Sequence, residues 1–224
     1  MSTSLSCPSC GGEVRLRSFT PYVACSYCRH ILVKVGDALQ DSGQVSEIAD
    51  DISPFQIGSE GWFEGVHFGL IGRVRMAWKD GFWNEWYAYF DDGRFGWLAE
   101  AQGTLAILFE SSDEEVNRAV FDDQLPAVRA NPQPLGQSIV IKSAPFVLSD
   151  IKRVECVVVE GETPRMSPLG EEFTVADFMG DNGELATAEA VTNPPRRRLF
   201  IGRYVGFEEL RLENLRELEG WPRR

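Results

Sequence analysis

The sequence predicts a mainly β protein, in which a small N-terminal module precedes a larger all-β body. Two observations support this prediction. The first 28 residues contain four cysteines in two Cys-x-x-Cys pairs. The rest of the chain alternates apolar with polar residues in short runs, and Asp-Gly and Asn-Gly turns separate several of these runs. We expect the body to form two similar halves of meander or barrel-like form, with one or two short helices.

The paired cysteines have the ligand spacing of a structural zinc site. Zinc accepts four thiolates in a tetrahedron at about 2.3 Å, and both pairs can reach one ion if the chain turns sharply inside each pair. Strand-like residues, 14–19 and 31–35, follow the two pairs. This order of knuckles and strands resembles a zinc ribbon, and we expect residues 1–36 to form one around Zn²⁺. The expected ligands are Cys7, Cys10, Cys25 and Cys28.

Disulfide formation and redox catalysis are the other uses of such cysteines. No secretory signal precedes them, which favours a cytoplasmic location where thiols stay reduced. A thioredoxin-like site needs only one pair, at a strand-to-helix junction. A metal site is therefore the preferred interpretation, and His30 is expected to be a surface residue because four thiolates complete a tetrahedron. The chain has no long apolar run, so no membrane span is expected.

Charge is distributed unevenly along the chain. Residues 1–36 carry four basic residues and one acidic residue, a net charge of +3, whereas the whole chain carries −12. The remainder therefore carries −15. An acidic body repels phosphate backbones, so nucleic acid is not expected to bind there and could meet only the ribbon.

A polar, acidic segment without aromatic residues, 37–53, is expected to link the ribbon to an all-β domain over 54–206. Hairpin signals in the first half of this domain, 54–110, are Asp80-Gly81 and Asp92-Gly93. Together they predict an antiparallel meander. Its expected strands are 73–78, 83–90, 95–100 and 104–109.

A short helix is expected between the halves, over about 113–121, because Ser112 and Asp113 can cap it and acidic residues follow them. The second half, 135–206, begins after a proline-containing loop at 131–134. The leucine-rich segment 207–224 is expected to be a docking segment, either helical or rich in turns. The strands expected in the second half are 138–142, 151–159, 172–177, 185–190 and 199–205, with turns at Asn182-Gly183 and 193–195.

Two correspondences suggest that the halves are related. Residues 71–74 (IGRV) correspond to 151–154 (IKRV), and 90–101 correspond to the longer segment 178–190. A degenerate duplication explains these correspondences, and so does chance similarity between two meanders.

Four segments carry a resemblance to a known family. They are FQIGSEGW at 55–62, IGRV at 71–74, WNEWY at 83–87 and GWLAE at 96–100. Over about residues 53–206 the chain resembles a bacterial domain-of-unknown-function family, number 4178, whose relatives carry a similar N-terminal zinc ribbon. The resemblance implies no established activity. It implies an accessory protein of a bacterial envelope or stress gene cluster, with protein partners that include membrane-associated ones.

A pair of carboxylates is the least ordinary feature of the body. If Asp92-Gly93 closes a loop of two or four residues, the residue numbers of directly paired positions on the two flanking strands sum to 185. Glu85 then lies opposite Glu100. Like charges across a ladder destabilise it, so such a pair could share a proton, bind a cation or face a basic group of a partner. Alternatively, both residues are exposed, or the loop has three residues and the register shifts.

The aromatic residues allow two interpretations. They could line a ligand groove, but in a small β domain they more often form the core. The candidate binding residues are therefore Glu85, Glu100, Trp83 and Tyr87. Cys156, whose neighbours two positions away are Val154 and Val158, is expected to be a buried strand residue. The aromatic residues concerned are Trp62, Trp83, Trp86, Tyr87, Tyr89 and Trp97.

The leading functional hypothesis is a non-enzymatic adaptor or scaffold of an envelope- or stress-associated system. No Ser-His-Asp, P-loop, Rossmann or metalloprotease spacing occurs in the sequence. One alternative is a small-molecule sensor or enzyme that uses the region of Glu85 and Glu100. Another is a nucleic-acid-binding zinc-ribbon protein. A buried pocket with converging carboxylates would favour the sensor or enzyme, and a flat exposed aromatic patch would favour docking.

Overall fold

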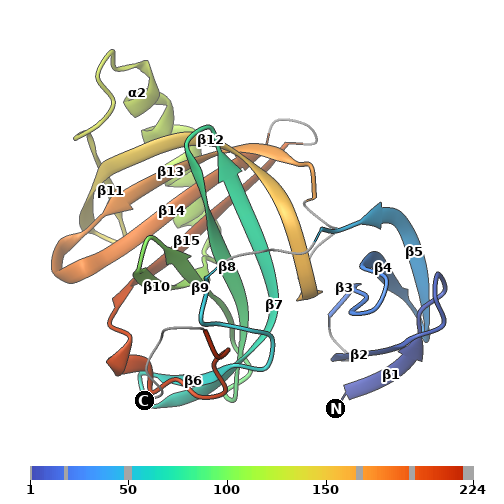
Figure 1. Ribbon diagram of the computed structural model, residues 1–224. Helices are drawn as coiled ribbons and strands as arrows, with labels where there is room; N and C mark the ends of the chain where they lie inside the picture. The colour runs from blue at the N-terminus through green and yellow to red at the C-terminus, as the bar shows by residue number, and fades with distance from the viewer. Residues whose placement is uncertain (1, 18–19, 48–51, 165–168, 192–194, 219–224) are drawn as a thin grey trace.

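The computed structural model describes residues 2–17, 20–47, 52–164, 169–191 and 195–218 (Figure 1). Within these residues the chain is mainly β, as predicted. It has two parts, which lie side by side in Figure 1. The N-terminal ribbon on the right holds strands β1 to β5, and a larger barrel on the left holds the remaining elements.

The ribbon consists of two antiparallel groups of strands. β1 pairs with β2, and β4 pairs with both β3 and β5. The strands predicted at 14–19 and 31–35 are confirmed as β2 and β4, except that residues 18 and 19 lie outside the described residues. The bounds are β1 Ser2–Ser6, β2 Glu13–Arg17, β3 Tyr22–Ala24, β4 His30–Val35 and β5 Ala38–Val45.

Part of the predicted linker, 37–53, is a strand. β5 pairs with β4 across a turn at Gly36 and Asp37, so the linker prediction is wrong for Ala38–Val45. The reason is that this strand buries only Leu39, and its sequence therefore lacks the apolar alternation that marks a half-buried strand. Positions 48–51 of the predicted linker lie outside the described residues.

Eight antiparallel strands of the body close into a barrel. Their order around it is β7, β8, β9, β10, β15, β14, β13 and β12, and the pairing of β12 with β7 closes the ring. Closure pairs backbone groups that an open sheet leaves unpaired at its edges. The bounds are β7 Val66–Trp78, β8 Gly81–Phe90, β9 Phe95–Ala101, β10 Thr104–Glu110, β12 Ala144–Thr163, β13 Glu172–Met179, β14 Glu184–Val191 and β15 Arg196–Val205.

The barrel is made of two four-stranded meanders. The first is β7 to β10 and the second is β12 to β15, and they meet at two seams, β7 with β12 and β10 with β15. This agrees with the two halves expected from the sequence. Segments 71–74 and 151–154 lie in the first strand of each meander, and 90–101 and 178–190 each span the hairpin of the second and third strands. A duplication as the origin of the halves stays a prediction.

A glycine lies at each seam, where two backbones approach closely. A Cβ atom at Gly72 would lie 1.8 Å from the carbonyl oxygen of Glu162, and one at Gly202 would lie 1.8 Å from that of Ile107. Neither position leaves space for a side chain. Both seams therefore depend on glycine for the same reason, although Gly72 belongs to the first meander and Gly202 to the second.

Different segments cover the outer faces of the two meanders. The first is covered by chain that precedes β7 and follows β15, including β6 (Glu60–Phe63) and a single turn at Glu208–Leu210, with Phe55 and Leu210 fully buried. This places the described part of the predicted docking segment, 207–218, against the barrel. The single turn is its only helical part within 207–218, and residues 219–224 lie outside the described residues.

One helix of 17 residues, 114–130, packs with β11 (Ser138–Ile141) on the second meander. It begins where predicted, because the Asp113 side chain accepts hydrogen bonds from the first turn. It extends nine residues past the predicted end at 121, because Leu125 and Val128 bury a further apolar face. Its parts are α1 Glu114–Arg118, a π-helical turn Ala119–Gln124 and α2 Leu125–Ala130.

The ribbon is attached to the barrel through β12 (Figure 1). This strand has 20 residues and continues past the barrel, where Glu162 and Thr163 pair with β3. Ala24 and Ile31 of the ribbon belong to the same buried cluster as the barrel interior. The ribbon and the barrel thus share backbone pairing and a core, which the predicted linker did not indicate.

Candidate metal centre and barrel cavity

Four cysteine sulfurs come together in the ribbon. The Sγ atoms of Cys7 and Cys28 are 3.7 Å apart, those of Cys10 and Cys25 are 3.8 Å apart, and all four lie within 4.8 Å of one another. Four thiolates bound tetrahedrally at about 2.3 Å have sulfurs ~3.8 Å apart. The predicted ligands are therefore spaced to hold a metal ion, and none of them forms a disulfide.

The two cysteine pairs lie in similar turns. The backbone N–H of Gly11 donates to the carbonyl of Cys7 at 2.9 Å, and that of Arg29 donates to the carbonyl of Cys25 at 2.8 Å. Gly11 and Arg29 both have a positive φ, 77° and 62°, which is unstrained only for glycine. His30 is not part of the sulfur cluster.

Two thiols of this cluster, those of Cys7 and Cys28, have shifted pKa values. Burial raises the pKa of Cys7, but backbone hydrogen bonds from Cys10 and Ser9 outweigh it and bring the value to about 7. At Cys28 the backbone of His30 favours the thiolate, but burial and the neighbouring thiols raise the pKa to about 12. A metal cation at this position would stabilise the thiolate form of all four cysteines together.

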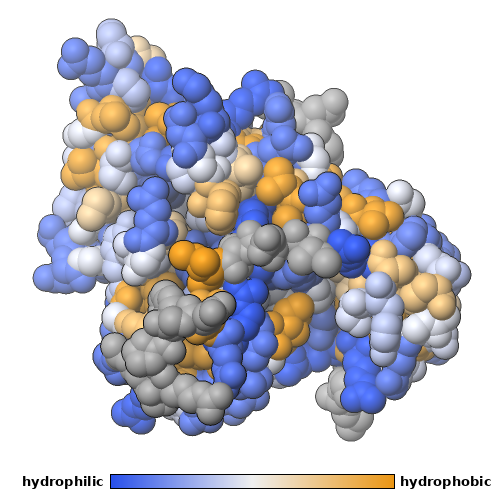
Figure 2. All heavy atoms as spheres, in the orientation of Figure 1, coloured by the Kyte–Doolittle hydropathy of each residue, from blue (hydrophilic) through white to orange (hydrophobic). Residues whose placement is uncertain are grey.

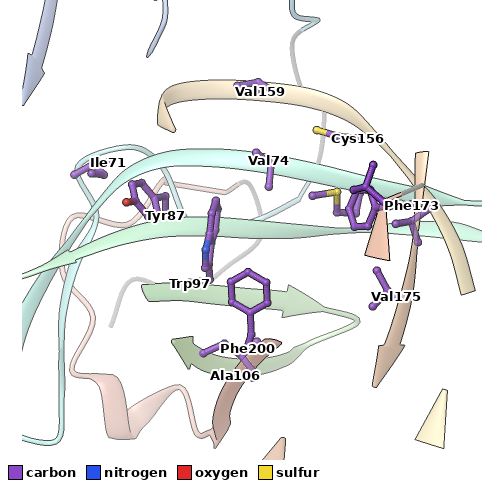
Figure 3. Packing of buried hydrophobic residues seen from close by; sticks show 14 of the residues in the cluster. Ile71, Val74, Tyr87, Trp97, Ala106, Cys156, Val159, Phe173, Val175 and Phe200 are labelled. Carbon is purple, nitrogen blue, oxygen red and sulfur yellow. The ribbon is translucent and has the colours of Figure 1, made fainter. Parts of the chain in front are cut away.

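A cavity of about 360 Å³ lies inside the barrel. Trp78 and Gln102 line it from the β7–β8 and β9–β10 hairpins, whereas the ribbon docks near the other end, beside Glu162. Eight strands are about the number that leaves room for one small ligand. Its charged lining residues are Glu85, Lys152, Asp177 and Glu189, and its aromatic ones are Trp78, Trp83, Trp97, Phe200 and Tyr204. Trp97 and Phe200 project into the interior in Figure 3.

Burial perturbs the carboxylate of Asp177. It raises the pKa of this group to about 6, and the negative charges of Asp150 and Glu85 act in the same direction. The Thr187 hydroxyl, which donates to Asp177 at 2.8 Å, and the ammonium of Lys152 lower the pKa without cancelling the effect of burial. The charge of Asp177 therefore changes just below neutral pH, and such groups are common in binding and catalytic sites.

An ammonium group already lies against the aromatic wall. The Nζ atom of Lys152 is 4.6 Å from the ring centre of Trp78 and 5.9 Å from that of Trp83, and it forms an ion pair with Asp150. The indole N–H of Trp83 donates to the Glu85 carboxylate at 2.9 Å. Cation–π contacts and a carboxylate therefore occur together at this wall.

The predicted pairing of Glu85 with Glu100 is wrong by one position. Glu85 lies opposite Ala99, and Asn84 lies opposite Glu100. The reason is the hairpin loop, which has three residues, 91–93, and uses Gly93 at a φ of 89°. A shift of one residue moves a side chain to the other face of the sheet, so Glu85 faces the cavity and Glu100 faces outward.

Glu100 has hydrogen-bond donors of its own on the outer face. Its carboxylate accepts from the hydroxyl of Ser53 at 2.7 Å, the amide of Asn84 at 3.1 Å and the indole N–H of Trp86 at 3.1 Å. Trp86 is fully buried. Glu100 therefore joins the segment before β6 to the barrel wall, and it does not form part of the cavity.

Only some of the cavity residues were predicted from the sequence. Trp83 and Glu85 line it, but Tyr87 packs between Phe95 and Trp97 in the core and is not a lining residue. Lys152, Asp177 and Glu189 were missed. Asp177 had a local signal, because it continues the inward-facing series of Phe173 and Val175 along β13. Cys156 is fully buried in the core, as predicted (Figure 3).

Among the described residues, no helix has the length and apolar character needed to cross a membrane. Comparison with the curated proteins and with the solved structures finds no match to the chain. A family model described as "Domain of unknown function (DUF4178)" matches residues 56–207, which include both meanders and exclude the ribbon. This match extends over more than half of the chain, and the chain therefore belongs to the DUF4178 family.

Proposed function

We propose that the barrel is a non-enzymatic binding domain for a small organic molecule, which corresponds to the sensor alternative from the sequence. The observation that supports this proposal is the cavity of about 360 Å³, which combines aromatic walls with carboxylates inside a closed barrel. Ligand sites are typically concave, mostly apolar and supplied with a few polar groups that orient the ligand. Among the described tryptophans, Trp86 lies in the core, three line the cavity (Trp78, Trp83 and Trp97), and Trp62 is half-buried beside His67, so they do not form one flat exposed patch.

We infer in addition that the ribbon binds one structural Zn²⁺. The supporting observation is the spacing of the four sulfurs, which fits tetrahedral thiolate ligands. All five cysteines are free thiols, which suits a reducing compartment such as the cytoplasm. Metal analysis of the purified protein tests this inference, since one zinc per chain is expected and an absence of zinc would contradict it.

One observation supports protein docking, the leading hypothesis from the sequence. Val140, Val147 and Met179 are exposed apolar residues on the neighbouring strands β11, β12 and β13. On the face shown in Figure 2, however, hydrophobic residues form separate patches rather than one surface. Changing Val147 and Met179 to serine should weaken capture of a partner if docking is the function, and should leave small-molecule binding unchanged.

The ribbon offers little support for nucleic-acid binding. Arg15 forms an ion pair with Glu13, and the guanidinium of Arg17 lies 4.9 Å from the ring centre of Tyr89. Two of its four basic residues therefore already have contacts within the protein.

Blocking the cavity tests the proposed function. Ala99 lines the cavity, so Ala99→Phe should abolish binding of small aromatic probes while leaving the barrel folded. Ala101→Phe, near the β9–β10 turn, provides a second variant in case the first is unstable. The probes are 2-phenylethylamine, 2-phenylethanol and 3-phenylpropionate, titrated by calorimetry. Absence of binding by all three to the unchanged protein, or equal binding by the blocked variants, would contradict the proposal.

A further inference from the structure

We infer that the barrel cavity selects a small organic cation, an amine whose apolar body lies against the tryptophans. This inference rests on the proposed ligand-binding function and adds the chemical class of the ligand.

The charge of the lining favours a cation. Among the described residues, three carboxylates line the cavity, those of Glu85, Asp177 and Glu189, and Lys152 is the one lining cation. Glu189 also forms an ion pair with Arg198 at 2.7 Å, where both side chains are nearly inaccessible to solvent. With Arg198 included, the carboxylates still outnumber the cations three to two. A concave site of this sign attracts positive ligands.

The aromatic wall favours the same kind of ligand. Lys152 places its ammonium 4.6 Å from the ring centre of Trp78, so the wall accepts a primary amine in the structure itself. The faces of tryptophan rings bind organic cations better than those of other side chains. Trp97 and Phe200 also line the cavity and project into the barrel interior (Figure 3). An amine with an apolar body can therefore contact the carboxylates and the rings together.

Two other ligand classes fit the lining less well. An anion would have to rely on Lys152, whose ammonium is already paired with Asp150. A bare metal ion needs several ligand atoms close together, and in the described part of the chain only the cysteine cluster brings three or more such groups within reach. Neither objection applies to an amine, which needs one carboxylate and an aromatic face.

Probes of matched size test the inference. In calorimetric titrations at pH 7.5, 2-phenylethylamine should bind at least about tenfold more tightly than 2-phenylethanol, because only the amine carries a charge to meet the carboxylates. The anion 3-phenylpropionate should bind most weakly. Equal or tighter binding of the alcohol or the anion would overturn this inference and leave the proposed cavity function standing. If none of the three binds, the proposed function fails and this inference fails with it.

Two variants assign the effect to the cavity. Asp177→Asn should weaken 2-phenylethylamine about tenfold and leave 2-phenylethanol unchanged. Lys152→Met should strengthen the amine, because it removes a like charge from the same wall. Glu172→Gln is the matched control, since Glu172 lies on the same strand but is solvent-exposed and paired with Arg153. Loss of amine binding in Lys152→Met, or an equal effect of Glu172→Gln, would overturn the inference.

Discussion

The two meanders of the barrel have the same topology but present different chemistry to the cavity. Within the described part of the chain, the first supplies all three tryptophans that line the cavity, Trp78, Trp83 and Trp97. The second supplies the one described lysine of the lining, Lys152, and two of its three described carboxylates, Asp177 and Glu189. One half therefore gives the cavity an aromatic wall and the other gives it most of its charge. A ligand that contacts both walls needs the closed barrel.

The outer faces differ in the same way. Segments from both ends of the barrel domain cover the first meander, whereas a helix between the halves covers the second. Among the described residues, the backbone pairing between ribbon and barrel involves the second meander alone, through the extension of β12. The two meanders therefore have similar backbones but pack against different segments. The two seams, in contrast, are alike, because each needs a glycine where two backbones approach closely.

Metal removal should have the largest effect on stability, and it should affect the two meanders differently. Small zinc modules gain about 10–16 kcal/mol from their metal, so a chelator should unfold the ribbon. Because β12 pairs with β3, the end of β12 near Glu162 should then exchange its amide hydrogens faster, while β8 and β9 of the first meander change little. Hydrogen exchange with and without chelator measures this. Unchanged exchange in β12 would show that the ribbon does not support the barrel.

Adding a methyl group at either seam should cost the second largest amount of stability. Gly72→Ala and Gly202→Ala place a Cβ on a backbone carbonyl oxygen, and we expect each to lower the free energy of unfolding by about 3 kcal/mol. Gly69→Ala in β7 is the control, because no atom lies within 4 Å of its added Cβ. Thermal and urea melts decide the outcome. A large loss at only one seam would show that the two seams are not equivalent.

Asp177 should make stability depend on pH. Its pKa is raised from 3.8 to about 6, so the folded state holds the proton more tightly than the unfolded chain. This contribution is fully present below about pH 4 and is lost as the pH rises through about 6. Asp177→Asn should therefore stabilise the protein at neutral pH, by at most about 3 kcal/mol. Urea melts of both proteins between pH 4 and 7.5 should converge toward the acidic end, and a constant difference would exclude this cause.

Replacement by glutamine should change the stability of the protein differently at Glu85 and at Glu100, which the sequence predicted to be a pair. Glu100→Gln should cost about 2 kcal/mol, because its carboxylate accepts three hydrogen bonds and the charged acceptor is lost. Glu85→Gln should change stability by less than about 0.5 kcal/mol, since the indole of Trp83 can still donate to the amide oxygen. Melts at pH 7 compare the two variants. Equal losses would mean that Glu85 is as firmly held in the cavity wall as Glu100 is outside it.

The strands were predictable because their signal is local. Alternation along 73–78 and the hairpin signals after it predicted a meander with further strands at 95–100 and 104–109, and the structure confirms β7, β9 and β10 there. Hairpin loops were less predictable. Asp80-Gly81 suggested a two-residue turn and Asp92-Gly93 a loop of two or four residues, but the first loop is Lys79-Asp80 and the second has three residues. Because of this one-residue error, the sequence predicted Glu100 on the same face as Glu85, whereas the structure places it on the outer face.

The cavity was not predictable because barrel closure creates it. Trp78 and Lys152 are 74 positions apart in the chain, and they meet because β7 pairs with β12. No local pattern specifies that pairing. The cysteine cluster, in contrast, was predictable, because two short motifs that lie close together in the sequence contain all four candidate ligands.

The seams have a consequence for how the chain folds. Within a meander, paired residues are close in sequence, but the seams join Gly72 to Gly161 and Leu105 to Val205, 89 and 100 positions apart. Loop-closure entropy makes such contacts slow to form. Each meander should therefore fold early as a curved sheet with two open edges, and the joining of the two halves should limit the rate. Before the halves join, the edges of β7 and β12 are open and can pair with another chain. A metal-loaded ribbon that already holds the end of β12 would shorten this interval.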